Sequence, residues 1–407
     1  MDTRMLWRHG VPAALLIALC PSPGAAQTQP VDNPVKLDDG ESVRISGLVS
    51  GTVFVNRALF GAFGQGQNAE YADKTELRHN NTFADGDIRN TRLRFDFSAG
   101  EVFDGWSPRA SVEVDFFGGQ DAPPFGDEQP RLRVRVAYAD LTNGRTTVRI
   151  GQNYAPLLGE LPQSASHVAF PLGFGSAGAI GWRFPGVFVY HDLVRGRQTT
   201  LGLQLAVMKG SGPIPGGAAA PVGTGEASGL PQLEARFDLG GRAQGLVWGT
   251  YLVGHMGWEA MNGLGMPDSA DERVSGWALE AGWKLAPGRV TLHGNAYYGR
   301  LLGANFGHIT QFGKVQGWGA WAQAGYNLSK HWSAWAFYGL DDPDEARFAR
   351  ETGRTLDRVK NQSVSGMLRY QITRYAIGLE YLRAATDWSV TGRSHAHQYA
   401  LSVLYRI

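Results

Sequence analysis

The sequence predicts an all-β protein, a transmembrane antiparallel up-and-down β-barrel of about 16 strands. Three observations predict it. A secretory signal sequence lies at the N-terminus, and apolar and polar residues alternate through most of the remaining chain. Short connections between the predicted strands alternate with long ones. A bacterial outer-membrane barrel has this organisation, with short turns on the periplasmic side and long loops on the extracellular side.

The first 26 residues have the composition of a secretory signal peptide. Arg4 and Arg8 precede the apolar run Val11–Cys20, and small residues before Gln27 fit a cleavage site. The run is too short to cross a bilayer as a helix, which takes about 20 apolar residues. We therefore expect export through the inner membrane and cleavage after residue 26.

The composition of the remaining chain excludes several classes of protein. Cys20 is the only cysteine, so disulfides and cysteine-based metal sites are not expected in the mature protein. No mature segment holds 18 uninterrupted apolar residues, which excludes a helical membrane protein. The 38 basic and 37 acidic side chains nearly balance, whereas nucleic-acid binders carry a clustered basic excess. The 12 tryptophans and 14 tyrosines suit the two interfaces of a membrane barrel.

Alternation is clearest at the C-terminus. Successive side chains of a strand face opposite sides, so residues two apart share a face. One face of this segment is apolar and the other is mostly polar, as Tyr399, Leu401, Val403, Tyr405 and Ile407 alternate with Ala400, Ser402 and Arg406. A helix would instead place apolar residues three and four apart.

The connections set the number of strands. Short ones with turn chemistry lie near residues 142–145, 194–197, 240–242, 287–289, 327–330 and 371–374, and a longer one lies near 99–108. Eight long polar or Gly/Pro-rich loops lie near 57–86, 118–130, 152–180, 209–230, 256–273, 301–313, 341–359 and 384–394. Eight long and seven shorter connections imply sixteen strands. We expect a short periplasmic segment at 27–41 and the barrel at 42–407.

Several strand sequences are similar to those of one porin family. The segments are Asn90–Phe97, Val112–Phe116, Arg131–Arg133, Val136–Tyr138, Arg149–Gln152, and the C-terminal region from Leu368 to Tyr381 and the last strand. Together they resemble the DcaP-like trimeric porins, relatives of the phosphate-selective porins. The resemblance implies a homotrimer of sixteen-stranded channels. It also implies that the third long loop, at about 152–181, folds inward and narrows each pore.

An arginine row is the main candidate for an anion-attracting site. By alternation its side chains lie opposite the apolar face and therefore line the lumen, where guanidiniums attract carboxylates and phosphates. The row comprises Arg131, Arg133 and Arg135, with Arg92, Arg94 and Arg149 on neighbouring strands. A purely structural interpretation remains open, because Asp96, Glu113 and Asp115 could neutralise the arginines across adjacent strands.

The third loop supplies the candidate constriction residues Glu160, Gln163, Ser164 and His167. Folded inward, Glu160 could oppose the arginine wall; the alternative is an ordinary surface loop. The segment Gly173–Gly178 matches a glycine-rich dinucleotide pattern but lacks the strand and helix that the pattern requires, so no cofactor is predicted. The sequence assigns no catalytic residue and no metal ligand.

These observations favour a porin for the passive diffusion of small hydrophilic solutes, with a mild preference for anions such as carboxylates or phosphate. The expected partners are small polar or anionic solutes, outer-membrane lipid and lipopolysaccharide, and no nucleic acid. Two alternatives remain. An outer-membrane hydrolase would need a Ser/His/acid or carboxylate group in fixed geometry, which no spacing here reveals. A surface interaction protein would use the long loops.

Overall fold

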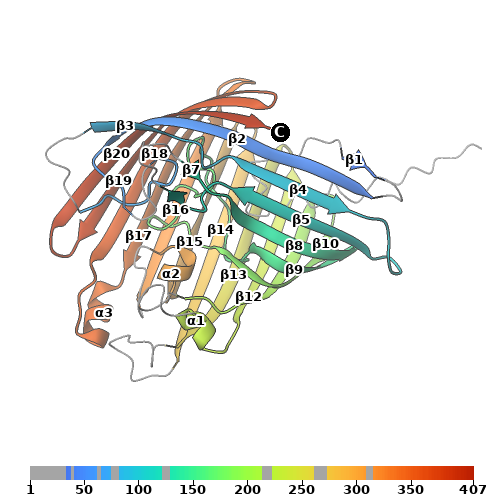
Figure 1. The fold of residues 1–407 in the computed structure, drawn as a ribbon, viewed down its shortest axis with the longest axis horizontal. Helices are drawn as coiled ribbons and strands as arrows, with labels where there is room; N and C mark the ends of the chain where they lie inside the picture. Colours follow the sequence, from blue (N-terminus) through green and yellow to red (C-terminus); the bar gives the residue numbers. More distant parts are fainter. Residues whose placement is uncertain are drawn as a thin grey trace, which may run out of the picture.

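The computed structural model describes residues 34–37, 41–61, 66–74, 82–121, 129–212, 222–260, 273–308 and 315–407. The predicted signal peptide and most of the 27–41 segment lie outside these residues. Sixteen antiparallel strands close into a barrel, which confirms the predicted fold and strand number (Figure 1).

The barrel strands run consecutively around the ring. They are β2 (Ser42–Arg57), β3 (Thr82–Asp87) with β4 (Arg92–Ser98), β5 (Ser107–Asp115), β8 (Arg133–Asn143), β9 (Thr146–Tyr154), β10 (Arg183–Arg195), β11 (Thr199–Met208), β12 (Gln232–Ala243), β13 (Leu246–Glu259), β14 (Val274–Pro287), β15 (Val290–Arg300), β16 (Gln316–Asn327), β17 (Trp332–Pro343), β18 (Arg358–Ile372), β19 (Tyr375–Trp388) and β20 (Gly392–Arg406).

The shorter elements are not strands of the ring. They are β1 (Val35–Lys36), β6 (Gln120–Asp121), β7 (Gln129–Pro130), α1 (Thr224–Ala227), α2 (Gly303–Phe306) and α3 (Glu345–Thr352). Among the residues that the structure describes, no helix is long and apolar enough to cross a membrane.

The ring closes through β2. One edge of β2 pairs with β20, from Leu48 opposite Arg406 to Arg57 opposite His397. The other edge pairs with both β3 and β4, so these two segments are halves of one barrel strand. Closure leaves no open edge, which is the condition for a sheet to span a bilayer.

Along each strand, side chains point alternately toward the outside of the barrel and toward its interior, as a membrane barrel requires. Val53 and Leu401 point outward and are exposed, whereas the next residues along the two chains, Phe54 and Ser402, point inward and are buried. The connection predicted at 240–242 was placed too early, because Gly240, Gly241 and Arg242 pair with both neighbouring strands inside β12. Between β12 and β13, Gln244 and Gly245 both have positive φ, at 48° and 83°, as in the type I′ turns that match the twist of a hairpin.

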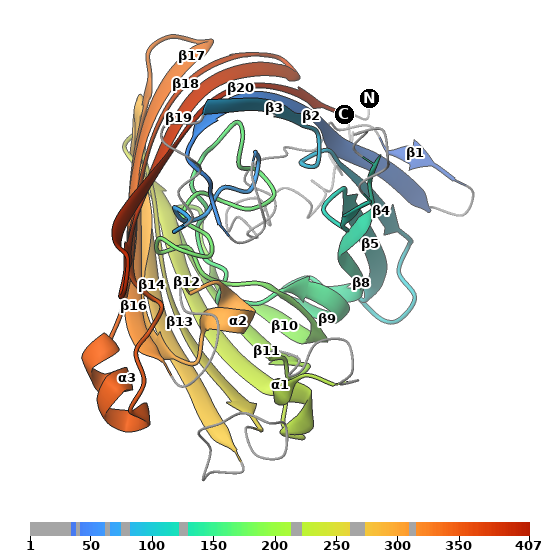
Figure 2. The same ribbon diagram turned by 60° about the vertical axis from the view of Figure 1, so that its left-hand side comes forward.

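Two of the long connections lie inside the barrel. The third loop, residues 155–182 between β9 and β10, buries Leu157 and Ile180 against aromatic side chains such as Phe188 and Phe306. The described part of the first loop, between β2 and β3, adds Phe60 and other residues to a second buried cluster. Figure 2 shows both loops within the ring of strands.

Candidate functional site

The third loop follows the inner wall through hydrogen bonds to successive strands. Just after β9, the backbone N of Leu157 donates to Glu234 Oε2 of β12 at 2.7 Å. Further along, Gln163 N donates to Gln323 Oε1 of β16 at 2.7 Å, and Gln323 Nε2 donates back to Gln163 O at 2.8 Å. Polar side chains of the wall thus satisfy loop backbone groups that would otherwise be buried without partners.

Glu160 is fixed against β14 and β15, on the side of the ring opposite β4. Lys284 Nζ and His293 Nδ1 lie 2.7 Å and 3.2 Å from Glu160 Oε1. Burial alone would raise the pKa of Glu160, but the hydrogen bond to His293 and the charge of Lys284 outweigh it and hold the pKa below its ordinary value. Glu160 therefore lies across the lumen from the arginine wall, as an anion whose charge is compensated locally.

Glu380 of β19 anchors the middle of the third loop. Its carboxylate, on a residue only 5 % exposed, accepts hydrogen bonds from Ser164 Oγ at 2.7 Å and from Ser166 Oγ at 2.6 Å. The backbone N–H groups of Ala165 and Ser166 also donate to it, at 3.1 Å and 3.0 Å, and Ser365 Oγ adds a bond at 3.2 Å. One buried carboxylate thus holds three consecutive loop residues.

The neighbouring imidazole belongs to the same buried cluster. Ser166 Oγ lies 3.0 Å from His167 Nδ1, and the backbone N of His167 donates to Ser164 Oγ at 2.8 Å. Burial lowers the pKa of His167, which favours the neutral imidazole. In a catalytic triad the acid would hold the imidazole, whereas Glu380 bonds the two serines and the backbone instead.

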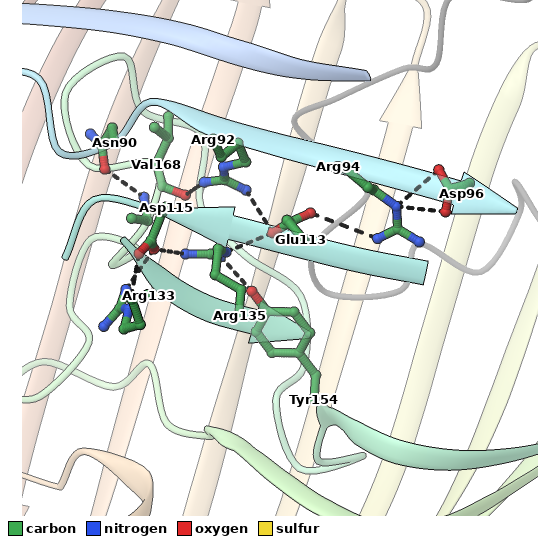
Figure 3. A network of polar contacts seen from close by, with 11 residues as sticks. Asn90, Arg92, Arg94, Asp96, Glu113, Asp115, Arg133, Arg135, Tyr154 and Val168 are labelled. Carbon is green, nitrogen blue, oxygen red and sulfur yellow. Dashed lines mark hydrogen bonds and ion pairs between the residues drawn. The ribbon is translucent and has the colours of Figure 1, made fainter. Parts of the chain in front are cut away.

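The loop then reaches the β4 side of the wall, beside the arginines (Figure 3). Asn90 Nδ2 donates to Ser166 O at 2.7 Å, and Ala169 N donates to Asn90 Oδ1 at 2.9 Å. Arg92 Nη2 donates to Val168 O at 2.5 Å. Arg92 is only 2 % exposed, so its role in the described geometry is to hold the loop rather than to face water.

Arg133 and Arg135 are paired with carboxylates across β5 and β8. Arg135 Nε donates to Glu113 Oε1 at 2.6 Å, and its Nη1 donates to Asp115 Oδ2 at 2.8 Å. Arg133 Nη2 donates to the same Asp115 oxygen at 2.6 Å, and Tyr154 Oη accepts a further bond from Arg135. The cross-strand neutralisation considered from the sequence is therefore present, although it is incomplete over the wall as a whole.

Three further ion pairs, made by two carboxylates, lie lower on the same wall. Arg94 Nε donates to Asp96 Oδ1 at 2.9 Å, and Arg44 of β2 lies 3.7 Å from the same carboxylate. Arg149 Nε donates to Asp140 Oδ1 at 2.7 Å, and its guanidinium lies 3.4 Å from the centroid of the Tyr138 ring. This set extends the wall toward the periplasmic ends of the strands.

Arg183, the first residue of β10, completes the wall and was not anticipated from the sequence. It is 6 % exposed and lies 4.4 Å from the centroid of the Trp182 ring, with no carboxylate within ion-pair distance among the described residues. Together with Arg92 and Arg135 it lines a cavity of about 20 Å³. The only local sequence feature that could have indicated a role for Arg183 is its position next to Trp182 at the end of the third loop.

Among the wall residues described above, positive charge exceeds negative charge. Four carboxylates, those of Asp96, Glu113, Asp115 and Asp140, face seven guanidiniums, those of Arg44, Arg92, Arg94, Arg133, Arg135, Arg149 and Arg183, which leaves a formal excess of three positive charges. Four of the seven side chains keep contact with water in the lumen. Their exposed fractions are 34 % for Arg44, 29 % for Arg94, 21 % for Arg133 and 15 % for Arg149.

The structure thus brings together five of the six predicted arginines. Arg131 differs, because β8 begins only at Arg133; the backbone of Arg131 bonds to Gly118 and Gly119, and its side chain is exposed. The loop residues Glu160, Gln163, Ser164 and His167 all lie within the barrel. Glu160 and Gln163 are held by β14 and β16, across the ring from the arginines. Ser164 is held by Glu380 of β19, three strands from β4, and His167 bonds to Ser164. Their proposed role at a constriction stays a prediction.

No family model and no curated protein matches this sequence. Among solved structures, the outer-membrane channel DcaP of Acinetobacter baumannii superposes with a TM-score of 0.66 at 19 % identity, over 92 % of this chain and 99 % of that chain. Salmonella typhi OmpF, solved with daunomycin, gives 0.57 at 12 % identity, over 92 % and 100 %. The anion-selective porin from Comamonas acidovorans gives 0.56 at 11 % identity, over 90 % and 100 %. The chain therefore has the fold of the outer-membrane porin channels, and the similarity to DcaP suggested by its strand sequences is confirmed at the level of the fold.

Proposed function

We propose that this protein is a passive diffusion channel of the bacterial outer membrane for small hydrophilic solutes, with a mild preference for anions such as carboxylates or phosphate. The excess of guanidiniums on the inner wall is the observation that carries the preference. Fixed cationic groups on the wall of a narrow aqueous passage raise the local concentration of anions.

The wall arginines divide between two tasks. Arg92 and Arg135 are nearly buried and hold the loop and the wall in place. Arg44, Arg94 and Arg133 keep part of their guanidinium surface in water and are the groups that a passing carboxylate would meet. Arginine suits this task because its planar fork of donors matches carboxylate and phosphate geometry.

Conductance in a planar lipid bilayer tests the proposal. The purified protein should produce stable conductance steps, and its reversal potential in a KCl gradient should favour chloride over potassium. Competing carboxylates, phosphate and sugars added in turn rank the solutes. Absence of conductance steps would remove the channel function, and a potential that favours potassium would remove only the anion preference.

A homotrimer in the outer membrane is part of the same proposal. The outer-membrane protein OmpT of Vibrio cholerae, solved in a trimer form, superposes with a TM-score of 0.55 at 12 % identity over 91 % of this chain. The signal peptide expected at residues 1–26 supplies the export route. The mass of the detergent-solubilised protein, measured by light scattering, distinguishes a trimer from a monomer.

We also propose that the protein is not an enzyme. The serine, imidazole and carboxylate nearest to a hydrolytic arrangement are Ser166, His167 and Glu380, which are 5 % exposed or less and bond the loop to the wall. A substrate could not reach them without displacing the loop. Ester or peptide hydrolysis that disappears in Ser166→Ala would overturn this assignment.

A further inference from the structure

A small cavity lies between the third loop and the arginine wall. Arg92 of β4, Arg135 of β8 and Arg183 of β10 line one side of it, and apolar residues of the loop, Leu158 and Val168 among them, line the other. Figure 3 shows Arg92 and Arg135 in this part of the wall, with Val168 beside Arg92. Three cationic side chains from three strands therefore meet at one small space.

Two of these guanidiniums keep a hydrogen-bond donor without a partner. Arg92 Nε and Arg183 Nη1 are both buried, and neither has a hydrogen-bond partner among the described residues. Arg92 Nη2 donates to Val168 O at 2.5 Å, but the ion pair of Arg92 with Glu113 is long, with Nη1 3.9 Å from Oε1. A buried N–H group normally has an acceptor, because leaving it unpaired costs its full desolvation penalty. The cavity that both side chains line is the place where such an acceptor fits.

The positive charge around the cavity is not compensated either. Arg135 bonds Glu113 at 2.6 Å and Asp115 at 2.8 Å. Arg133 shares Asp115, at 2.6 Å. Arg183 has no carboxylate within ion-pair distance in the described part of the chain, and the charges of Arg133 and Arg135 repel it. A buried charge without a counter-charge is strongly unfavourable.

An anion in the cavity meets both needs, whereas a neutral ligand meets only one. A water molecule would accept hydrogen bonds from Arg92 and Arg183 but would add no negative charge. The Trp182 ring, whose centroid lies 4.4 Å from Arg183, offsets part of the cost of burying this guanidinium but likewise carries no net charge. A bound anion is the ligand that supplies a counter-charge as well as an acceptor.

The size of the cavity selects a monatomic ion. Its volume is about 20 Å³, and a cavity needs roughly 10–15 Å³ by the same measure to hold one water molecule. One halide ion fits this space, whereas phosphate or an organic carboxylate does not. The apolar side chains in the lining, such as Leu158 and Phe174, also favour a single negative charge, because a multivalent ion loses more hydration free energy when it is buried.

We propose that this cavity binds one chloride ion as a fixed part of the arginine wall. Arg92 Nε and Arg183 Nη1 donate to the ion, and the charge of Arg135 adds to its attraction. The ion also acts on the third loop, because Arg92 holds Val168 O in the middle of the loop and Arg183 directly follows its last residue. The chloride therefore stabilises the docking of the loop against β4 and β10.

This chloride site is distinct from the anion preference proposed above. Solutes that pass through the lumen would meet the partly exposed arginines, whereas Arg92, Arg135 and Arg183 are buried. A chloride ion held by these residues stays in place while solutes diffuse past it. The site therefore does not depend on whether the channel prefers anions.

Bromide is the probe that locates the site, because it is a halide close to chloride in size and its anomalous X-ray scattering identifies it. Crystals of the native protein grown in sodium bromide should show one anomalous difference peak in the cavity, beside Arg92 Nε and Arg183 Nη1. Crystals transferred to sodium gluconate should lose the peak. A cavity without an anomalous peak in the bromide crystals would overturn the proposal, and this measurement needs no variant.

The thermal unfolding temperature, followed by tryptophan fluorescence, tests the effect of the ion on stability. Sodium chloride replaces sodium gluconate stepwise at constant ionic strength, and the unfolding temperature should rise along a saturation curve, because the ion binds only the folded protein. Arg183→Gln should lose this rise, and it leaves no buried carboxylate without a partner. Arg44→Gln makes the same charge change on the wall but outside the cavity, and it should keep the rise.

Two outcomes of the unfolding experiment would contradict the proposal. An unfolding temperature of the native protein that does not depend on chloride would show that no such ion stabilises the loop. An equal rise in Arg183→Gln and in the native protein would assign the chloride effect to another part of the molecule. Conductance and reversal potential remain separate measurements, so failure of the chloride site and failure of the proposed channel function are distinguishable.

Discussion

Glu380 accepts a hydrogen bond from Ser166 Oγ at 2.6 Å, and this contact joins residues 214 positions apart in the chain. Because Ala165 N and Ser166 N donate to the same carboxylate, the bond fixes the third loop rather than one side chain. The contact between Glu380 and Ser166 therefore ties the position of the third loop inside the barrel to the packing of β19.

Glu380→Ala is expected to release the loop. Two serine hydroxyls and two backbone N–H groups of the loop would lose their acceptor inside the barrel, at a cost on the order of 3 kcal/mol in the free energy of loop docking. Single-channel recordings should show larger and noisier conductance steps. Glu380→Gln keeps one acceptor oxygen and should give an intermediate result. Unchanged conductance in both variants would show that other contacts determine the loop position.

Arg133→Ala is expected to lower anion selectivity without unfolding the barrel. Arg133 is partly exposed to the lumen, and its partner Asp115 would keep its hydrogen bond from Arg135. The substitution therefore removes one positive charge and leaves no buried carboxylate unpaired. The reversal potential in a KCl gradient measures the change. Arg350→Gln, on the exposed surface of α3, is the matched control and should leave the potential unchanged. Equal potentials in Arg133→Ala and the native protein would make this arginine purely structural.

Arg135→Ala should behave differently from Arg133→Ala. Arg135 is 3 % exposed and bonds both Glu113 and Asp115, which are themselves buried. Removing one partner of a buried charge network leaves an uncompensated charge and costs about 3–5 kcal/mol. The thermal unfolding temperature, followed by the loss of β-sheet circular dichroism, should fall well below that of Arg133→Ala. Similar unfolding temperatures for the two variants would contradict this division of the wall.

Period-two alternation could predict the barrel, because lipid on one side and water on the other impose it on every strand. The last strand, expected from residues 399–407, appears as β20 with the same faces. Alternation cannot show where a strand begins, and this is why Arg131 was expected in a strand that starts at Arg133. The pairing of β5 with β8 also contains a register shift between Glu113 and Val114, which simple alternation does not predict.

The contacts of the site were less accessible to sequence reasoning. The bond between Ser166 and Glu380 depends on where a loop lies after the ring has closed, and no local pattern encodes that. Arg183 lies on the arginine wall because the third loop ends there and β10 begins at this residue.

Glu70 makes stability depend on pH in a defined direction. This first-loop residue is 3 % exposed, and neither carboxylate oxygen has a hydrogen-bond partner among the described residues. Burial raises its pKa well above the ordinary value of 4.5, although the charge of Arg358 opposes the shift. The folded protein therefore binds the proton more tightly than the unfolded chain. The stabilisation is complete below about pH 4.5 and is lost as pH rises toward the folded-state pKa.

Glu70→Gln should remove this part of the pH dependence. The amide cannot ionise, so the variant should gain stability relative to the native protein at neutral pH and show little gain near pH 4. Thermal unfolding measured from pH 4 to pH 8 reports the difference between the two proteins. Glu345→Gln, exposed on α3, controls for the loss of one carboxylate. If the difference between Glu70→Gln and the native protein stays constant over this range, the carboxyl of Glu70 titrates as it does in the unfolded chain, and burial in the first loop does not control its charge.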